Sequence, residues 1–355
     1  MLGYLGIAIA SAVVLKPLTL DAQRELMRLV SYICFYYVVT DWCQSKDNTR
    51  TLLKVLMAST IAVAIFGLWQ ALTGGYTALY YFLYPVQEEI SRIPAWEGRI
   101  TSFLEHYNGL AGYLNLVLPF CLAFATAGTD IGLRILSRWC LVLAGIALLL
   151  TQSRGGLLAF VAILLMHVYF SARDRKTRVQ RVALVLLICL LAAAVAGLFF
   201  QRLGEIDDFT AVSRLAIWDG AFTVFAQSPL LGTGFGNLRS LMGGLLNLPD
   251  GWTGDAHNLY LELLAETGLT GFLVFGSLIV LALRTALRQF RKTQNDFSRM
   301  IALAVFAAIC GVLVHGTVDY LFHTTPQATA LFFLVLGLLS AQASTGETVP
   351  KRQAA

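Results

Sequence analysis

The chain has 355 residues, of which 57% are hydrophobic and 13% charged, and its mean hydropathy is +0.69. The apolar fraction exceeds the roughly 45–50% of soluble domains and excludes a soluble globular protein. The basic residues behind the net charge of +5 lie in short loops between apolar runs, so they indicate membrane topology and not a nucleic-acid partner.

Most apolar runs approach the ~20 residues that a helix needs to cross a hydrocarbon core of ~30 Å. They are rich in Leu, Ala and Val and lack the alternation of a β-barrel, which predicts an all-α, polytopic membrane protein of about ten spans. The expected spans are Leu2–Leu15, Leu26–Thr40, Thr51–Leu72, Gly109–Thr126, Trp139–Thr151, a run that ends at Phe170, Val182–Phe200, Gly268–Leu283, Met300–Val318 and Gln327–Gln342.

Lys and Arg gather in cytoplasmic loops, and the basic loops after Phe170 and Leu283 place both termini in the cytoplasm. Only Lys16, Arg24 and Arg28 disagree with this topology, because they fall on its outer side.

The topology divides the chain into four parts. These are N-terminal spans in residues 1–200 with an outer loop at 73–107, a large extracytoplasmic loop at 201–267 between spans 7 and 8, C-terminal spans at 268–343, and a disordered cytoplasmic tail at 344–355.

The run Trp139–Thr151 is expected to be a short helix. Its roughly 13 residues rise only ~20 Å, which is less than the hydrocarbon thickness. We therefore expect the turn that carries Arg154 to lie below the outer surface.

Polar residues are expected to converge on the outer side, where Arg99, Arg154, Arg214 and His257 would face one cavity. Arginine binds phosphate bidentately, so two such residues could clamp a diphosphate. The arginines would disfavour a charged His257 and keep it neutral, which suits a general base. The alternatives are that Arg154 reaches the lipid headgroups and that His257 is structural.

Other polar groups point less strongly to chemistry. Glu262 and Glu266 are expected on a helix surface, and Gly268 is expected to allow close packing within a membrane helix. His315, Asp319 and His323 recur at helical spacing. A hydrogen-bonded polar patch is the preferred interpretation of these three, and a metal site is the alternative.

Three motifs, taken in order, resemble the O-antigen ligase and polymerase family. They are Leu150-Thr-Gln-Ser-Arg154-Gly-Gly156; Arg214-Leu-Ala-Ile-Trp218 with Ser228-Pro-Leu-Leu-Gly232-Thr-Gly234; and His257-Asn258 with Glu266-Thr-Gly268-Leu-Thr-Gly271. The resemblance implies a multi-pass enzyme of the bacterial inner membrane with its active site facing the periplasm. Its donor would be a glycan on undecaprenyl diphosphate.

The resemblance also implies roles for individual residues. Arg154 and Arg214 would hold the diphosphate while His257 deprotonates an acceptor hydroxyl, giving inversion without a cofactor or metal. Arg99, Asn258, Asp255 and Asp319 would bind substrate, and which of Arg99, Asp255 and Asp319 orients His257 stays open.

The acceptor is predicted from the long outer segment after Phe200, which is typical of ligases. Ligation to lipid A-core is therefore the preferred prediction of the reaction. Polymerisation of O-antigen or exopolysaccharide and transfer to protein are alternatives within the family. A transporter or flippase of an anionic lipid-linked glycan is the alternative of another class.

Overall fold

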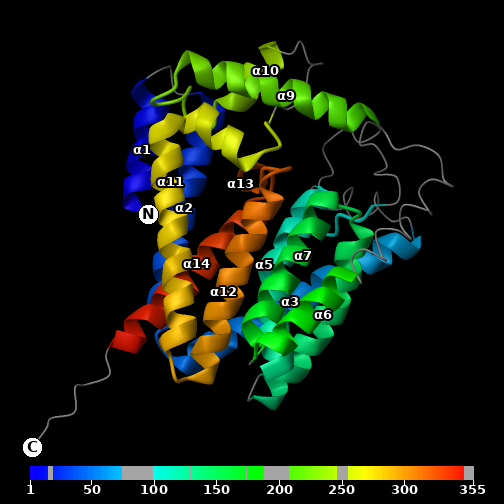
Figure 1. Ribbon diagram of the computed structural model, residues 1–355. Coiled ribbons are helices and arrows are strands. Elements are labelled where there is room, and N and C mark those ends of the chain that lie inside the picture. Colours follow the sequence, from blue (N-terminus) through cyan, green and yellow to red (C-terminus); the bar gives the residue numbers. More distant parts are fainter. Residues whose placement is uncertain are drawn as a thin grey trace, which may run out of the picture.

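The computed structural model describes residues 1–14, 19–73, 99–104, 106–127, 130–172, 174–187, 208–245 and 255–347. Every regular element in these ranges is a helix, which confirms the all-α prediction (Figure 1). The labelled helices are α1 (Leu2–Val14), α2 (Leu20–Trp42), α3 (Lys46–Thr73), α5 (Tyr107–Ala127), α6 (Ile131–Leu150), α7 (Arg154–Ser171), α9 (Asp208–Gln227), α10 (Leu238–Leu245), α11 (Leu259–Lys292), α12 (Asp296–His315), α13 (Leu321–Thr324) and α14 (Pro326–Glu347).

Seven of these helices, namely α3, α5, α6, α7, α11, α12 and α14, are long and apolar enough to cross a membrane. They confirm a polytopic membrane protein and seven of the ten expected spans. The first two expected spans are not confirmed: α1 has only 13 residues, and α2 has charged residues along its first half. Of the expected span Val182–Phe200, the described part is helical as far as residue 187, and the rest lies outside the described residues, as do loop 74–98 and tail 348–355.

Helix α5 lies at the centre of the bundle. In its apolar window 89% of the residues are buried, against 22–33% for α3, α6, α7 and α11, so those four helices contribute most of the surface exposed to lipid. Asn115 is a buried polar residue of α5, and its side-chain amide donates to the carbonyl of Gly156 in α7 (2.8 Å). Polar groups inside the membrane must find partners within the protein, so this bond sets α5 against α7.

The helices alternate between two ends of the bundle. At one end α3 begins, α7 ends, α11 ends and α12 begins, and we call it the basic end because Lys and Arg are concentrated there. At the other end lie residues 99–108, 151–156, 255–258 and 316–325, and we call it the site end.

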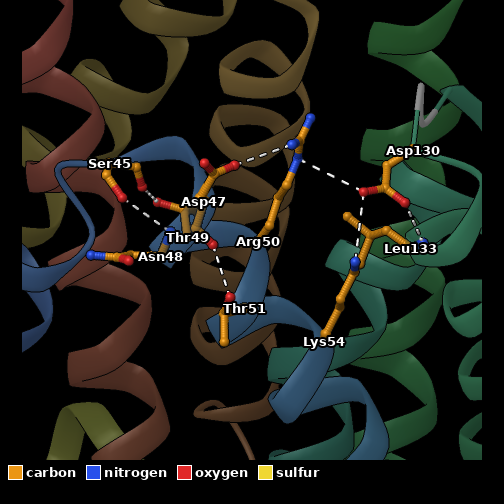
Figure 2. Close-up of polar contacts among 9 residues, drawn as sticks. All are labelled: Ser45, Asp47, Asn48, Thr49, Arg50, Thr51, Lys54, Asp130 and Leu133. Atoms are coloured by element: carbon orange, nitrogen blue, oxygen red, sulfur yellow. Dashed lines mark hydrogen bonds and ion pairs between the residues drawn. The ribbon is translucent and has the colours of Figure 1, made fainter.

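At the basic end, a carboxylate joins α3 to α6 (Figure 2). Asp130 caps α6 by accepting the N–H of Leu133 (2.9 Å), and its other oxygen lies 3.8 Å from Arg50 Nε and 3.7 Å from Lys54 Nζ. Arg50 also pairs with Asp47 (3.3 Å). The bond from Leu133 and the two cations lower the pKa of Asp130, so these charges are mutually satisfied.

Helix α6 corrects the expected short span. It begins at Ile131 and not at Trp139, and its 20 residues rise about 30 Å. The helix includes the basic stretch with Arg134 and Arg138, which the sequence interpretation left in a loop. The expected recess of Arg154 below the outer surface therefore loses its basis.

The segment expected to be a loop is largely helical. Helices α9 and α10 lie across the site end, transverse to the long helices (Figure 1). Helix α11 begins at Leu259, which confirms the helix that was expected to begin near Asn258 and to carry Glu262 and Glu266. Residues 246–254 lie outside the described part of the chain.

Helix α11 is broken at Gly268, which has φ 64° and ψ −169°. The turn that follows α9 pairs with this break through backbone hydrogen bonds. Thr233 N–H donates to Ala265 O (2.8 Å), and Leu269 N–H donates to Pro229 O (2.8 Å). A Cβ added to Gly268 would collide with the backbone of Leu230. Gly268 thus allows the close backbone approach that was expected, but it does so at a break in α11 and not within a regular helix.

Replacing Gly268 by Ala should destabilise the protein. Its backbone conformation is open essentially to Gly alone and would cost on the order of 1–3 kcal/mol, in addition to the contact with Leu230. The measurement is the thermal unfolding midpoint in detergent. Gly276→Ala is the matched control on the same helix, because nothing lies within 4 Å of the added Cβ. An equal midpoint for the two variants would contradict this account.

Candidate functional site

Hydrogen bonds tie together loops of the site end that are far apart in the chain. Ile100 N–H donates to Leu150 O (3.3 Å), and the hydroxyl of Ser153 donates to Asn108 Oδ1 (2.7 Å). Ser153 also caps α7 by accepting the N–H of Gly156 (3.1 Å). The segment after Arg99 is therefore fixed against the α6–α7 turn that carries Arg154.

A second set of bonds joins the start of α11 to the segment after α12. The side chain of Asn258 accepts the N–H groups of Tyr260 and Leu261 and so caps α11. Its amide nitrogen donates to Thr317 O (3.0 Å), and Leu259 N–H donates to Gly316 O (2.7 Å). Asn258, which was expected to bind substrate, uses both ends of its side chain to place its neighbour His257.

His257 faces a carboxylate from the segment after α12. Its Nδ1 lies 3.2 Å from Asp319 Oδ1, and the same oxygen accepts the N–H of Tyr320 (2.9 Å). The Asp319 side chain is 5% exposed and the His257 side chain 33% exposed, so the carboxylate is fixed while the imidazole reaches solvent. His257 also has a positive φ of 46°, which is uncommon for a residue with a side chain and occurs often at functional sites.

The charges around His257 correct an expectation. Burial lowers the pKa of His257, but the hydrogen bond to Asp319 and the charges of Asp319 and Asp255 outweigh it and raise the pKa above the ordinary value. Arg214 acts in the expected direction and is weaker. The expectation that arginines dominate and hold His257 neutral was wrong. The hydrogen bond and the negative charges of the two carboxylates change the pKa of His257 more than the positive charge of Arg214 does.

Asp319, the partner of His257, is ionised in this pair. Burial would raise its pKa, but the hydrogen bond from His257 and the neighbouring imidazoles His315 and His106 lower it. Asp319 therefore stays ionised and accepts Nδ1–H of His257. In the neutral form of His257, the hydrogen held on Nδ1 by Asp319 leaves the lone pair of Nε2 available to take a proton, which is how an orienting carboxylate supports a general base.

Asp255 lies in the same region, behind His257. It is 2% exposed, and burial raises its pKa, partly offset by the charges of Arg239 and His257. Its Oδ1 has no hydrogen-bond partner among the described residues. Asp255 thus affects His257 through its charge, while Asp319 makes the hydrogen bond.

The three arginines of the prediction lie at the site end. Arg99 stacks on the ring of Tyr107 at 4.7 Å. Arg214 is half-buried on α9, close enough for its charge to lower the pKa of both His257 and His106. Arg154 is exposed at the first position of α7, where helical N–H groups favour an anion. The structure brings Arg214 near His257 and places Arg154 on the adjoining turn.

His106 is a site residue to which the sequence interpretation gave no role. Its Nδ1 accepts the N–H of Asn108 (3.1 Å), which places its hydrogen on Nε2. Burial lowers the pKa of His106 to about 4, with Arg99 and Arg214 acting in the same direction. A neutral imidazole that donates from Nε2 thus lies beside the His257–Asp319 pair. The run His106-Tyr-Asn after a polar loop was the available signal.

Glu262 and Glu266 are wholly buried, which corrects their expected place on a helix surface. Glu262 accepts the N–H of Ala256 (2.6 Å), and Glu266 accepts the N–H of Leu238 (3.4 Å). These carboxylates anchor the residues before His257 and the start of α10 to α11. They are structural supports of the site.

The expected helical stripe of His315, Asp319 and His323 is interrupted. Helix α12 ends at His315, with Gly316 as its C-cap, so Asp319 lies in the following turn and reaches His257. The His323 side chain lies outside the described residues. Within the described ranges, no group of three His, Cys, Asp or Glu side chains is close enough to hold a metal ion.

A family model described as O-antigen ligase matches residues 139–276. Over these residues the chain is similar to that family, which confirms the resemblance and the prediction of an enzyme that acts on lipid-linked glycans. Arg154, Arg214 and His257 fall inside the match; Arg99 and Asp319 fall outside it. No curated protein sequence matches the chain.

Removing the carboxylate partner should lower the pKa of His257. In Asp319→Asn the imidazolium loses its hydrogen bond and a negative charge while burial remains, so the neutral form persists to lower pH. The measurement is a pH titration by NMR of the protein with its five histidines labelled. Asp296→Asn, at the basic end, should leave the titration unchanged. A rise in the pKa of His257 in Asp319→Asn would contradict the pairing.

Proposed function

We propose that the site end transfers a glycan from undecaprenyl diphosphate to an acceptor hydroxyl, with His257 as the general base. The observation that carries the proposal is the pair of His257 and Asp319, with the charge of Arg214 beside it. Asp319 holds Nδ1–H, so Nε2 takes the hydroxyl proton as the acceptor oxygen attacks the anomeric carbon. The bond from that carbon to the diphosphate breaks, and the attack from the opposite face inverts the carbon.

The leaving group in this reaction is a lipid diphosphate, and its charge requires cations. Arg214 supports this role because it is half-buried near His257, and Arg154 supports it through its position at the start of α7. Guanidinium groups hold phosphate oxygens in a fixed geometry and keep their charge at any working pH. His106 adds a neutral N–H donor in the same region. No ATP or sugar nucleotide enters the reaction, since the diphosphate is the activating group.

The site end is proposed to face the periplasm. Support comes from the distribution of cations, because cytoplasmic ends of membrane helices are enriched in Lys and Arg. The described cations at the basic end are Lys46, Arg50, Lys54, Arg134, Arg138, Arg175, Lys176, Arg178, Arg181, Arg284, Arg288, Arg291, Lys292 and Arg299. At the site end arginines are fewer, and the charges of Arg99 and Arg214 both act on His106.

The proposed acceptor is lipid A-core, which makes the reaction a ligation. Helices α9 and α10 lie across the site end (Figure 1), and α9 carries Arg214, whose charge acts on His257, which supports contact of this layer with a bulky acceptor. A comparison of glycans from cells with and without the chain tests the acceptor. A ladder of bands on lipid A-core would support ligation, and altered chain length on the lipid carrier alone would contradict it.

His257→Ala should abolish transfer while donor binding persists. Loss of a general base costs about 10²- to 10⁴-fold in rate, whereas the arginines that hold the diphosphate remain. The measurements are glycan transfer by purified protein and separate binding of the lipid-linked donor. His257→Gln, which keeps a polar side chain of similar length, should be equally inactive. Transfer at an unchanged rate in either variant would refute the role of base.

Arg154→Ala and Arg214→Ala should weaken donor binding by about 10- to 100-fold, since a charged hydrogen bond to phosphate is lost in each. The affinity for lipid-linked donor is the measurement. Arg134→Ala, at the basic end, is the matched control and should bind donor as the unaltered protein does. Retained affinity in both site-end variants would remove the diphosphate clamp from the proposal.

A further inference from the structure

A polar cavity lies at the basic end, far along the bundle from His257. It has a volume of about 460 Å³, within the roughly 300–1,000 Å³ of small-molecule pockets. Its lining comes from the end of α7, the helical residues 175–187, the end of α11 and the start of α12. The side chains that define its chemistry are Tyr169, Phe170, Arg178, Phe290, Arg291 and Arg299.

The cavity collects three positive charges. No ion pair joins Arg178, Arg291 or Arg299 to a carboxylate in the parts of the chain that the structure describes, and no acidic residue lines the cavity there. Arg178 Nε is buried without a hydrogen-bond partner among the same residues, and its Nη2 makes only a long bond to Ala172 O (3.5 Å). A buried N–H group without a partner is costly, so a ligand that accepts a hydrogen bond from Arg178 Nε is expected there.

Two other cations of the same end have carboxylate partners. Arg50 and Lys54 lie beside Asp130, and Arg50 also pairs with Asp47 (Figure 2). The cavity arginines lack a carboxylate partner among the described residues and share one cavity, so an external anion is the partner expected there.

Two of the arginines are held by aromatic rings. Arg178 lies 4.7 Å from the centre of the Tyr169 ring, and Arg299 lies 4.8 Å from the centre of the Phe290 ring. Stacking restrains a guanidinium by its face and leaves the N–H groups along its edge for hydrogen bonds. The cavity therefore presents positioned donors and not only diffuse charge.

The position of the cavity selects the kind of anion. It lies where the candidate spans α7 and α11 end and α12 begins. Beneath the arginines, Phe170 packs on Phe290 (5.6 Å) and on Phe306 (5.4 Å), so the polar layer rests on an aromatic one. An amphiphile with a phosphate above hydrocarbon matches this order, and basic pockets between membrane helices bind anionic headgroups.

We propose that this cavity binds the phosphodiester headgroup of an anionic phospholipid, with Arg178, Arg291 and Arg299 around the phosphate. The lipid acts here as a bound ligand of the folded bundle, bridging α7, α11 and α12 at their ends. The site is separate from the proposed transferase site and does not depend on it. Inorganic phosphate shares the headgroup's charge and is the competing source of an anion.

The experiment titrates the full-length protein in a neutral detergent with dioctanoyl phosphatidylglycerol, dioctanoyl phosphatidylcholine and inorganic phosphate, and measures each dissociation constant. Phosphatidylglycerol should bind, and Arg178→Ala/Arg291→Ala/Arg299→Ala should bind it about a hundredfold more weakly, since each cation strengthens anion binding several-fold. Arg175→Ala/Arg284→Ala/Arg288→Ala removes the same charge from exposed positions of the same end and is the matched control.

The control variant should bind phosphatidylglycerol as the unaltered protein does, and phosphatidylcholine and phosphate should bind at least about tenfold more weakly. Equal weakening in both triple variants would show general attraction and overturn the site. Phosphate binding as tight as lipid binding would overturn the lipid occupant, and absence of lipid binding would overturn the proposal. If the triple variant elutes as aggregate, Arg178→Gln alone decides, with weaker lipid binding expected and unchanged binding refuting.

Discussion

The structure of the site depends on one backbone contact, the turn of residues 229–234 set into the break of α11 at Gly268. A helix that breaks within a membrane protein exposes N–H and C=O groups, and these must find partners inside the protein. Here the turn after α9 supplies them, through Thr233 and Leu269 among others. Because the turn follows α9 directly, the contact fixes Arg214 relative to the helix that begins beside His257. Two motifs separated in the sequence are therefore one structural unit.

The break also divides α11 by task. Residues 259–267 form a short helix at the site end, and its buried carboxylates, Glu262 and Glu266, fix the loops around it. The remainder of α11, after the break, continues the candidate span Leu259–Lys292 to the basic end. His257 lies just before this short helix, with Asn258 as the cap. A base next to a rigid, capped helix is positioned more accurately than a base on a long loop. Proton abstraction requires such accurate positioning.

The sequence predicted the helical class and the seven of its ten expected spans that are confirmed, because hydropathy and charge follow directly from composition along the chain. It could not predict the partner of His257. Asp319 lies 62 residues away, and its role depends on α12 ending at His315. Gly268 was equally ambiguous, since glycine permits both close helix packing and a positive φ. The burial of Glu262 and Glu266 could not be predicted from the sequence, because the contacts of Glu266 include Leu238, which lies 28 residues away along the chain.

The opposing charges around His257 connect donor binding to base strength. Asp319 and Asp255 raise the pKa of the imidazole and Arg214 lowers it. In the proposed reaction, a diphosphate held by Arg214 would cancel that cation's effect and add negative charge nearby. The lone pair of Nε2 would then be more basic with donor bound than without it. A histidine set between carboxylates and an arginine would thus gain proton affinity at the step where the acceptor hydroxyl must lose its proton.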